Sequence, residues 1–507
     1  MKGIILVAAL TTASVLFAGN AANPNACELS PIPLPVEFKS DMDRPLDFGP
    51  KTVVTVECSD ASAATWLGDH LAAWYGANAP KVVAGKATGA PALRDGPEAY
   101  AIAADPSGVR IAARTIAGVR WAAYTIRQIV IVRRGTMTTA GYLLPTLTVS
   151  DAPHLAFRGL HLCWLPEIRP QQIERAIRLA AMFKFNTIVL EPWAVFRSEK
   201  HPWISWPDAK MTKAEVRRLV AIGKDLGVTL VPQFASLGHA PGTRAGSLKH
   251  PVLDLTPEYE PLYEPGGWNW CISNPEAQRV IRDVILELLD AFDHPPYIHL
   301  GCDEAQPPTC PECRKRPYGE LCCEHIANLA AFTKEHGARA MIWGDMLLKA
   351  GDPRWKGYIV TGTDETVRMV DLLPKDVIVC DWQYVNHRDA KDKDWPTIRH
   401  FAEKGFPVVG CPWDNYKSMR PMSDTISKVG GFGFLETTWH HLRGQDWIAM
   451  YLFAAAAAWG SDLAPDLPQF DSRFAIPLQL VGRDMKLKDY RDSGHVNYQL
   501  PPSWWQN

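Results

Sequence analysis

The chain has 507 residues, of which 47% are hydrophobic and 21% are charged, and its formal net charge is -2. This balance excludes a disordered or fibrous protein, and the length predicts two or more domains. The sequence contains no basic stripe of the kind that binds nucleic acid or an anionic membrane.

The N-terminus has the pattern of a targeting segment. Lys2 precedes the apolar stretch Ile4–Ala18, which is too short to span a bilayer comfortably, and the small residues of Gly19-Asn20-Ala21 follow. The pattern predicts a signal peptide over residues 1–21 and export to the periplasm or the medium, with an uncleaved anchor as the alternative. No later stretch is long and apolar enough to cross a membrane.

Residues 22–150 predict a small α+β accessory domain without an obvious set of catalytic residues. Its expected elements are three strands and two helices, namely Thr52–Val56, Ala61–Tyr75 (helix), Ala99–Ala103, Val109–Ala113 and Ile116–Val132 (helix).

A strand-then-helix rhythm repeats eight times over residues 151–461. The expected strands are short and apolar, as strands buried on both faces are: Ala156–Cys163, Thr187–Pro192, Thr229–Phe234, Tyr297–Cys302, Arg339–Trp343, Val377–Trp382, Pro407–Cys411 and Gly433–Thr437. The pattern predicts an α/β fold in which a closed (β/α)8 TIM barrel follows the accessory domain. Residues 462–507 are expected to form a C-terminal wrap.

Catalytic residues of such a barrel lie at the C-terminal ends of its strands. Nearly every predicted strand here ends in a Trp, a carboxylate or a His. Carboxylates and aromatic rings in one cleft favour carbohydrate chemistry, because a flat apolar ring suits the face of a sugar.

The fourth predicted strand leads into His299-Leu300-Gly301-Cys302-Asp303-Glu304. Neighbouring residues on a strand point to opposite faces, so an adjacent Asp-Glu pair is poorly placed to act as two carboxyls across one bond. The segment resembles the His-x-Gly-Gly-Asp-Glu signature of the family 20 β-N-acetylhexosaminidases. Stretches such as Gly118–Ala122 and Leu147–Pro153 resemble the same family, and the resemblance covers about residues 30 to 460.

The resemblance implies an exo-acting enzyme that removes a terminal N-acetylhexosamine (GlcNAc or GalNAc) by substrate-assisted retaining catalysis. The 2-acetamido oxygen of the sugar would attack the anomeric carbon. Glu304 would be the general acid and base, and Asp303 would orient the acetamido group. The expected partner is a carbohydrate with a terminal N-acetylhexosamine, and neither a metal nor an organic cofactor is expected in the chemistry.

The resemblance also implies a set of substrate-binding residues. Arg158 corresponds to a family arginine that binds sugar hydroxyls, with a salt bridge at the base of the first strand as the alternative. His239 resembles a histidine near the acid, and Tyr384 is preferred over Tyr416 as donor to the acetamido oxygen. The remaining expected members of the set are Glu191, Trp343, Asp345, Trp382 and Trp439.

The chain departs from the family pattern at several positions. Cys302 replaces the second Gly of the motif, and Cys163 replaces an Asp of the first strand. Glu191 and Ala194 stand where a His and an Asp are usual, and that Asp normally partners the histidine matched by His239. These features resemble a divergent branch similar to hexosaminidase D.

The chain has 11 Cys, so at least one thiol is free or pairs outside the chain. Four of them lie close together after the catalytic motif, and Cys310-Pro311-Glu312-Cys313 has metal-knuckle spacing. Disulfides or free thiols are favoured over a structural metal for this cluster, which consists of Cys310, Cys313, Cys322 and Cys323.

Two other functions remain open. The first is a glycan-binding relative without turnover. The second is a retaining glycosidase with a carboxylate nucleophile, for which the candidates are Asp345, Asp381, Asp414 and Glu436.

Overall fold

The structure is a computed structural model. It describes residues 30–133, 141–242, 252–384, 395–439, 449–463, 477–478 and 480–485. The predicted signal peptide over residues 1–21 lies outside these ranges, as does most of the expected C-terminal wrap. Within the described ranges, no helix has the length and apolar character needed to cross a membrane.

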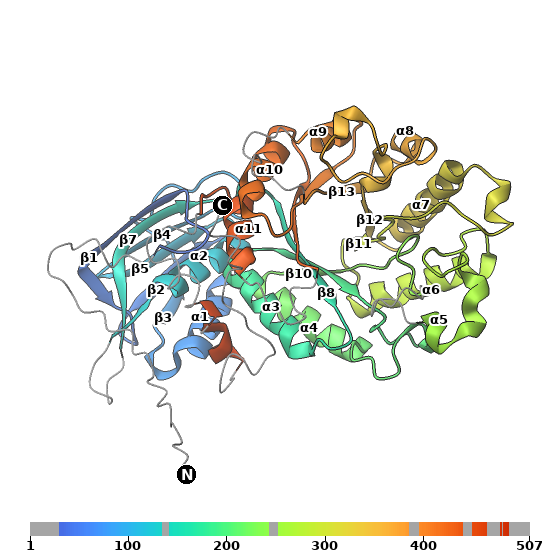
Figure 1. Ribbon diagram of the computed structural model, residues 1–507. Helices are drawn as coiled ribbons and strands as arrows, with labels where there is room; N and C mark the ends of the chain where they lie inside the picture. Colours follow the sequence, from blue (N-terminus) through green and yellow to red (C-terminus); the bar gives the residue numbers. More distant parts are fainter. Residues whose placement is uncertain are drawn as a thin grey trace, which may run out of the picture.

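The N-terminal domain, on the left in Figure 1, contains a mixed sheet of seven strands. Their order is β1-β7-β4-β5-β2-β3, and β6 pairs with β7. Helix α1 (Ala63–Tyr75) and helix α2 (Ile116–Ile129) complete this domain. Its strands are β1 (Glu37–Asp47), β2 (Val53–Cys58), β3 (Lys81–Ala84), β4 (Tyr100–Asp105), β5 (Gly108–Ala113), β6 (Ile131–Arg133) and β7 (Gly141–Asp151). The sequence patterns missed β1, β3, β6 and β7.

Eight parallel strands form the second sheet, in the order β10-β9-β8-β15-β14-β13-β12-β11. They are β8 (Phe157–Trp164), β9 (Thr187–Pro192), β10 (Thr229–Pro232), β11 (Tyr297–His299), β12 (Arg339–Trp343), β13 (Ile378–Trp382), β14 (Val408–Cys411) and β15 (Gly433–Thr437). A β-bridge between Gln233 and His299 joins β10 to β11, the first and last strands of this order. The N–H of Phe234 also donates to the carbonyl of His299 at 2.8 Å. The predicted (β/α)8 barrel, preceded by an α+β domain, is therefore confirmed.

Helices follow the barrel strands, and their termini agree with local sequence signals. Helix α4 starts after Thr212, whose side chain accepts from the N–H of Glu215, and ends at Gly227 with a φ of 85°. The described helices of this half are α3 (Pro170–Met182), α4 (Lys213–Leu226), α5 (Val252–Leu255), α6 (Pro275–Ala291), α7 (Tyr318–Glu335), α8 (Met369–Leu372), α9 (Pro396–Glu403), α10 (Tyr416–Lys428) and α11 (Ala449–Trp459).

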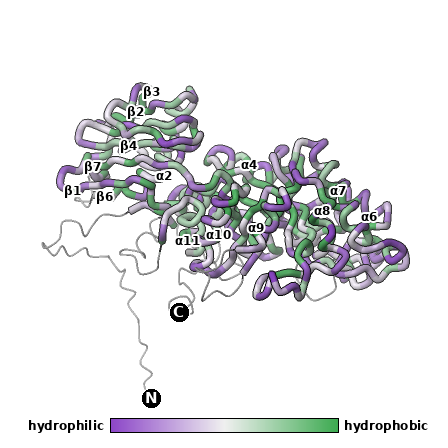
Figure 2. The backbone as a smooth tube through the Cα atoms, turned by 90° about the horizontal axis from the view of Figure 1, so that it is seen from above, coloured by the Kyte–Doolittle hydropathy of each residue, from purple (hydrophilic) through white to green (hydrophobic). Residues whose placement is uncertain are grey.

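The two halves meet through buried polar contacts near α2, α3 and α11, and Figure 2 shows both halves from above. The carboxylate of Asp151 accepts from the indole of Trp459 at 3.0 Å and lies 3.2 Å from Nζ of Lys184. Gln128 donates to the carbonyl of Met182 at 2.9 Å. These contacts tie the accessory domain to the base of the barrel, at the end opposite the strand C-termini.

Candidate active site

The loop after β11 carries Asp303 and Glu304 in an unusual backbone conformation. Gly301, Cys302 and Glu304 have φ values of 69°, 72° and 49°. Such angles suit glycine and are costly for other residues. The positive φ at Cys302 explains why glycine is expected at that position of the motif.

A second loop, which follows β10, packs directly against this backbone. A Cβ atom on Gly238 would lie 2.2 Å from the carbonyl oxygen of Asp303, so only glycine allows the approach. The next residue, His239, places Nε2 3.3 Å from Oδ2 of Asp303 and 3.2 Å from Oε2 of Glu304. One histidine thus bridges both predicted catalytic carboxylates.

The two carboxylates differ in their access to solvent. The side chain of Asp303 is 8% exposed, whereas that of Glu304 is 42% exposed. An enclosed carboxylate is suited to bind and orient a group of the substrate. An open carboxyl is suited to exchange protons with a leaving group and with water.

Asp345, just after β12, supports the Glu304 loop from within the barrel. Its Oδ2 accepts from the backbone N–H of Glu304 at 3.0 Å and from the hydroxyl of Thr361, and its Oδ1 accepts from the indole of Trp382 at 3.1 Å. Burial and then the negative charge of Asp303 raise the pKa of Asp345 to about 7.

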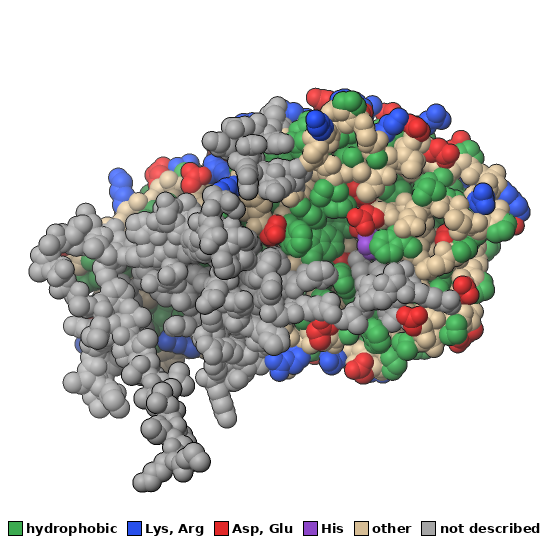
Figure 3. Space-filling view, in the orientation of Figure 1, with side chains coloured by type: hydrophobic (Ala, Val, Ile, Leu, Met, Phe, Trp, Pro, Cys, Tyr) green, Lys and Arg blue, Asp and Glu red, His purple; other side chains and the backbone are tan. Residues whose placement is uncertain are grey.

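Aromatic side chains surround these carboxylates. The indole of Trp439 donates to the hydroxyl of Tyr384 at 2.7 Å, and the Tyr384 ring lies 5.2 Å from that of Trp382. Burial raises the pKa of Tyr384 well above its usual value, so its hydroxyl stays protonated. Trp343 is 1% exposed beneath this group, with its ring 5.9 Å from that of Trp439. In the space-filling view, hydrophobic side chains, carboxylates and a histidine gather on the barrel half of the molecule (Figure 3).

Glu191 lies at the end of β9 in a buried polar group. Its Oε2 is 3.4 Å from Nε2 of His161 and 3.5 Å from the sulfur of Cys163. Glu191, Ala194 and His239 also line one pocket. The carboxylate expected as partner of His239 is thus absent at Ala194, and Glu191 is the acidic residue of this pocket.

Arg158 is not in the site, and its assignment to substrate binding is wrong. It lies at the N-terminal end of β8 and is 1% exposed. Its guanidinium pairs with Glu98 at 2.6 Å and donates to the carbonyls of Leu155 and Lys184. The salt bridge at the base of the strand, the alternative interpretation, is what the structure shows.

The sequence patterns missed two residues that hold the site together. The indole of Trp268 donates to the carbonyl of Glu304 at 2.9 Å, and its ring lies 4.2 Å from that of His239. Thr361 donates to Asp345. Neither residue directly follows a barrel strand, so a search for functional residues at the C-terminal ends of strands does not find them.

Two groups among the described residues bring together side chains of metal-ligand type. One is His161, Cys163 and Glu191, and the other is Glu264, Cys271, Cys310 and Cys313. The sulfurs of Cys310 and Cys313 thus meet Cys271, rather than Cys322 and Cys323 as predicted. The cysteines of the described ranges are all free thiols.

Comparisons with known families agree with this architecture. Residues 26–152 match the model of glycosyl hydrolase family 20, domain 2, and residues 197–421 match that of the glycosyl hydrolase family 20 catalytic domain. The second match includes Asp303 and Glu304. It begins after β9 and so leaves out the strands in which Cys163 and Glu191 depart from the expected pattern.

Among curated proteins, a β-hexosaminidase of Vibrio furnissii is 23% identical over 71% of this chain and 60% of its own length. A β-N-acetylhexosaminidase of Cellulomonas fimi is 28% identical over 42% of this chain and 45% of its own. The chain therefore spans less than two thirds of the length of these relatives.

Solved structures show the same fold. An exo β-N-acetylglucosaminidase of Vibrio harveyi, in complex with N-acetylglucosamine, superposes with a TM-score of 0.66 at 17% identity over 91% of this chain and 79% of the other. A β-N-acetylhexosaminidase of Bacteroides fragilis gives 0.65 at 17% identity over 93% and 99%.

Proposed function

Since this chain belongs to glycoside hydrolase family 20, we propose that it is an exo-acting β-N-acetylhexosaminidase that works by substrate-assisted retaining catalysis. The observation that carries this proposal is the pair of adjacent carboxylates at the end of β11, one enclosed and one open, both within 3.3 Å of His239 Nε2. The substrate is a glycan that ends in N-acetylglucosamine or N-acetylgalactosamine.

In this mechanism the sugar supplies its own nucleophile, the oxygen of its 2-acetamido group. The enclosed carboxylate of Asp303 accepts a hydrogen bond from the acetamido N–H and stabilises the positive charge that develops on that group. The exposed Glu304 protonates the leaving oxygen and then removes a proton from the attacking water. Tyr384, a neutral hydroxyl, donates to the acetamido oxygen, and Trp382 and Trp439 enclose the acetamido methyl.

The contacts and pKa shifts of the four candidate nucleophiles give less support to the alternative mechanism, in which a carboxylate attacks the sugar. Both oxygens of Asp345 are occupied by protein donors, and those of Asp381 accept from Gln383 and Thr397. Burial raises the pKa of Glu436 well above its usual value, which favours a neutral and poorly nucleophilic acid. Asp414 remains, and burial raises its pKa as well.

The first test is hydrolysis of paired chromogenic 2-acetamido and 2-hydroxy β-glycosides, in gluco and galacto forms. We expect turnover of the acetamido substrates alone. Glu304→Gln is expected to lose about 100- to 10,000-fold in kcat, the usual size of a general acid–base contribution. The matched control, Asp414→Asn, should retain activity.

Two results would reject the proposal. Equal turnover of 2-hydroxy substrates, together with loss of activity in Asp414→Asn, would indicate a carboxylate nucleophile. A folded protein that binds N-acetylhexosamine but hydrolyses none of the four substrates would be a glycan-binding relative.

We also propose that the chain is exported, on the basis of Lys2 and the apolar stretch Ile4–Ala18. N-terminal sequencing of the protein from the periplasm or the medium should find a start near residue 22. Recovery of the intact N-terminus from the cytosol would contradict export.

A further inference from the structure

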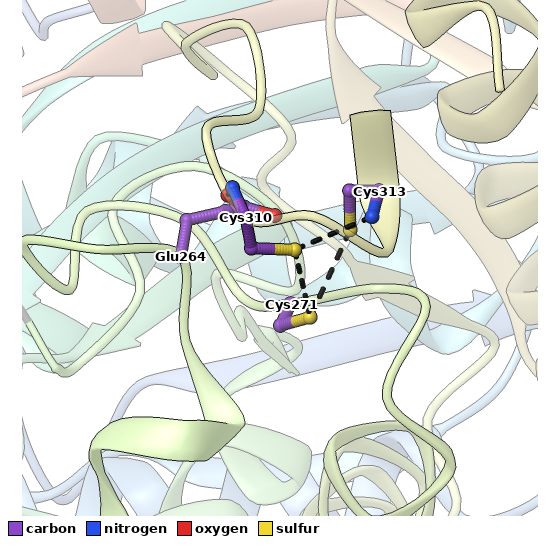
Figure 4. A group of neighbouring side chains, drawn as sticks. All are labelled: Glu264, Cys271, Cys310 and Cys313. Carbon is purple, nitrogen blue, oxygen red and sulfur yellow. Dashed lines mark hydrogen bonds between the residues drawn. The ribbon is translucent and has the colours of Figure 1, made fainter. Parts of the chain in front are cut away.

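Four side chains from two separate loops converge on one point, as Figure 4 shows. Glu264 and Cys271 come from the segment between α5 and α6. Cys310 and Cys313 come from the segment that follows Glu304, between β11 and α7. All four ligand atoms lie within 4.8 Å of one another.

The sulfur–sulfur distances fit a metal-thiolate centre. The sulfur of Cys271 is 3.6 Å from that of Cys310 and 3.7 Å from that of Cys313. A tetrahedral zinc ion with bonds of about 2.3 Å to sulfur places its thiolates about 3.8 Å apart. A disulfide would need about 2.05 Å between two sulfurs and would leave the third without a partner.

The Cys310-x-x-Cys313 segment already has the hydrogen bonding of a metal knuckle. The backbone N–H of Cys313 donates to the sulfur of Cys310 at 3.3 Å, and the carbonyl of Cys310 accepts from the N–H of Arg314 at 3.2 Å. Hydrogen bonds of this kind orient the ligands of a metal and stabilise thiolate charge.

Glu264 supplies a fourth ligand atom. Its Oε2 accepts from the N–H groups of Thr309 and Cys310, at 2.8 Å each, which fixes the carboxylate. Its Oε1 is buried and accepts from no N–H or O–H group of the described residues, and the thiols of Cys310 and Cys313 lie beside the carboxylate. A buried carboxylate oxygen without a donor is costly unless a cation or proton occupies the position.

We propose that Cys271, Cys310, Cys313 and Glu264 bind one zinc ion in a tetrahedral structural site. Binding releases the protons of the three thiols, so each sulfur bonds the metal as a thiolate. Four protein ligands leave no open position, which is the mark of a structural rather than a catalytic zinc. A surface pocket lined by Cys271 and Cys310 gives the ion a path of entry.

The position of the site gives it a role in ordering the catalytic loop. The two loops that it joins are also tied by Asn269, which donates to the carbonyl of Gln306 at 2.6 Å, and by Trp268, which donates to the carbonyl of Glu304. Zinc would cross-link the same two loops covalently, six residues beyond Glu304. His325 is not a ligand, because its nitrogens contact the carbonyl of Ser236 and the amide of Gln278.

The test is the metal content of untagged wild-type protein after dialysis, measured by plasma mass spectrometry. We expect about one zinc per chain, near-complete loss in the double variant Cys310→Ser/Cys313→Ser, and retention in Cys323→Ser, a buried cysteine of α7 outside the group. Glu264→Gln should keep the fold and lower zinc affinity at least about tenfold, as measured by chelator competition.

Cobalt exchange of the wild-type chain gives a readout that needs no variant, since tetrahedral thiolate coordination produces charge-transfer absorption in the near ultraviolet. The proposal is overturned if the wild type holds no more zinc than the double variant and shows no such band with cobalt. It is also overturned if the freshly isolated protein has a disulfide between two of the three sulfurs. Both readouts are independent of glycoside hydrolysis, so failure of the zinc site and failure of the proposed activity are separate results.

Discussion

The backbone N–H of Glu304 donates to Oδ2 of Asp345 at 3.0 Å, so a buried carboxylate on the neighbouring strand end holds the residue proposed as the general acid. Glu304 has a φ of 49°, and a backbone in that region persists only where surrounding contacts enforce it. Asp345 is therefore a positioning residue for the catalytic loop.

Asp345→Asn should lower kcat by about 100-fold with little change in KM, because small displacements of a catalytic group have effects of that size. Steady-state kinetics on the acetamido substrate measure it. Asp381→Asn is the control, since Asp381 is equally buried but contacts Gln383 and Thr397 instead of the Glu304 loop. Equal losses in both variants would mean that the effect of Asp345 is general destabilisation.

The carboxyl group of Asp345 makes the free energy of unfolding depend on pH. The folded pKa of Asp345 is about 7, above the unfolded value near 3.9, so between these values the folded state holds a proton that the unfolded state has lost. This contribution to stability is complete below about pH 4 and is lost as pH rises through 7.

Urea unfolding at a series of pH values should therefore show the wild type losing stability relative to Asp345→Asn between pH 4 and 7, by on the order of 3 kcal/mol. If plots of unfolding free energy against pH stay parallel for the two proteins, the raised pKa of Asp345 is contradicted.

Tyr384 and Trp439 should act as one unit in the proposed acetamido pocket. Tyr384→Phe removes both the acceptor of the Trp439 indole and the proposed donor to the substrate, and we expect a fall in kcat of about 100-fold. Trp439→Phe should lower kcat as well, and the loss in the double variant should be smaller than the product of the two single losses. Strict multiplicativity in this double-mutant cycle would indicate that the hydrogen bond does not couple the two residues.

Arg158 should matter for stability and not for substrate affinity. Arg158→Met removes the cation that pairs with Glu98 and leaves that carboxylate only its hydrogen bonds from Trp121 and Asn186. Loss of one member of a buried ion pair costs about 3–5 kcal/mol. Chemical denaturation measures the loss, and KM measured at low temperature should be unchanged. The exposed pair Arg354–Asp352 offers the comparison: Arg354→Met should cost less than about 1 kcal/mol. A raised KM in a stable Arg158→Met protein would restore the sugar-binding assignment.

Cys302 should tolerate glycine better than any branched residue. Cys302→Gly relieves the cost of a φ of 72° and loses only a small buried side chain, so stability should change by about 1 kcal/mol or less. Cys302→Val places a β-branched residue in the same conformation and should be clearly destabilising in thermal melts. Equal stability of the two variants would show that backbone strain at this position is negligible.

The barrel and the proposed catalytic pair could be predicted because both depend on local sequence patterns. Buried parallel strands such as β9 and β12 are short apolar runs, and the observed bounds of both equal the predicted ones. Asp303 and Glu304 follow the fourth strand in a motif that can be found in the sequence. The edge strand β1 was missed because its few apolar residues, Phe38, Met42 and Leu46, are four positions apart instead of two. Its neighbour β7, an inner strand of the sheet, was missed although residues 146–150 alternate between polar and apolar.

Contacts between distant segments were decided only by the tertiary structure. The sequence does not show that Arg158 lies at the strand base facing Glu98, 60 residues earlier, or that Trp268 reaches the carbonyl of Glu304. It also places Cys310 and Cys313 near Cys322, whereas folding brings Cys271 to them from the preceding loop. Spacing along the chain determines which residues share a strand or a helix face. The closure of the barrel and the packing of its loops determine which side chains meet.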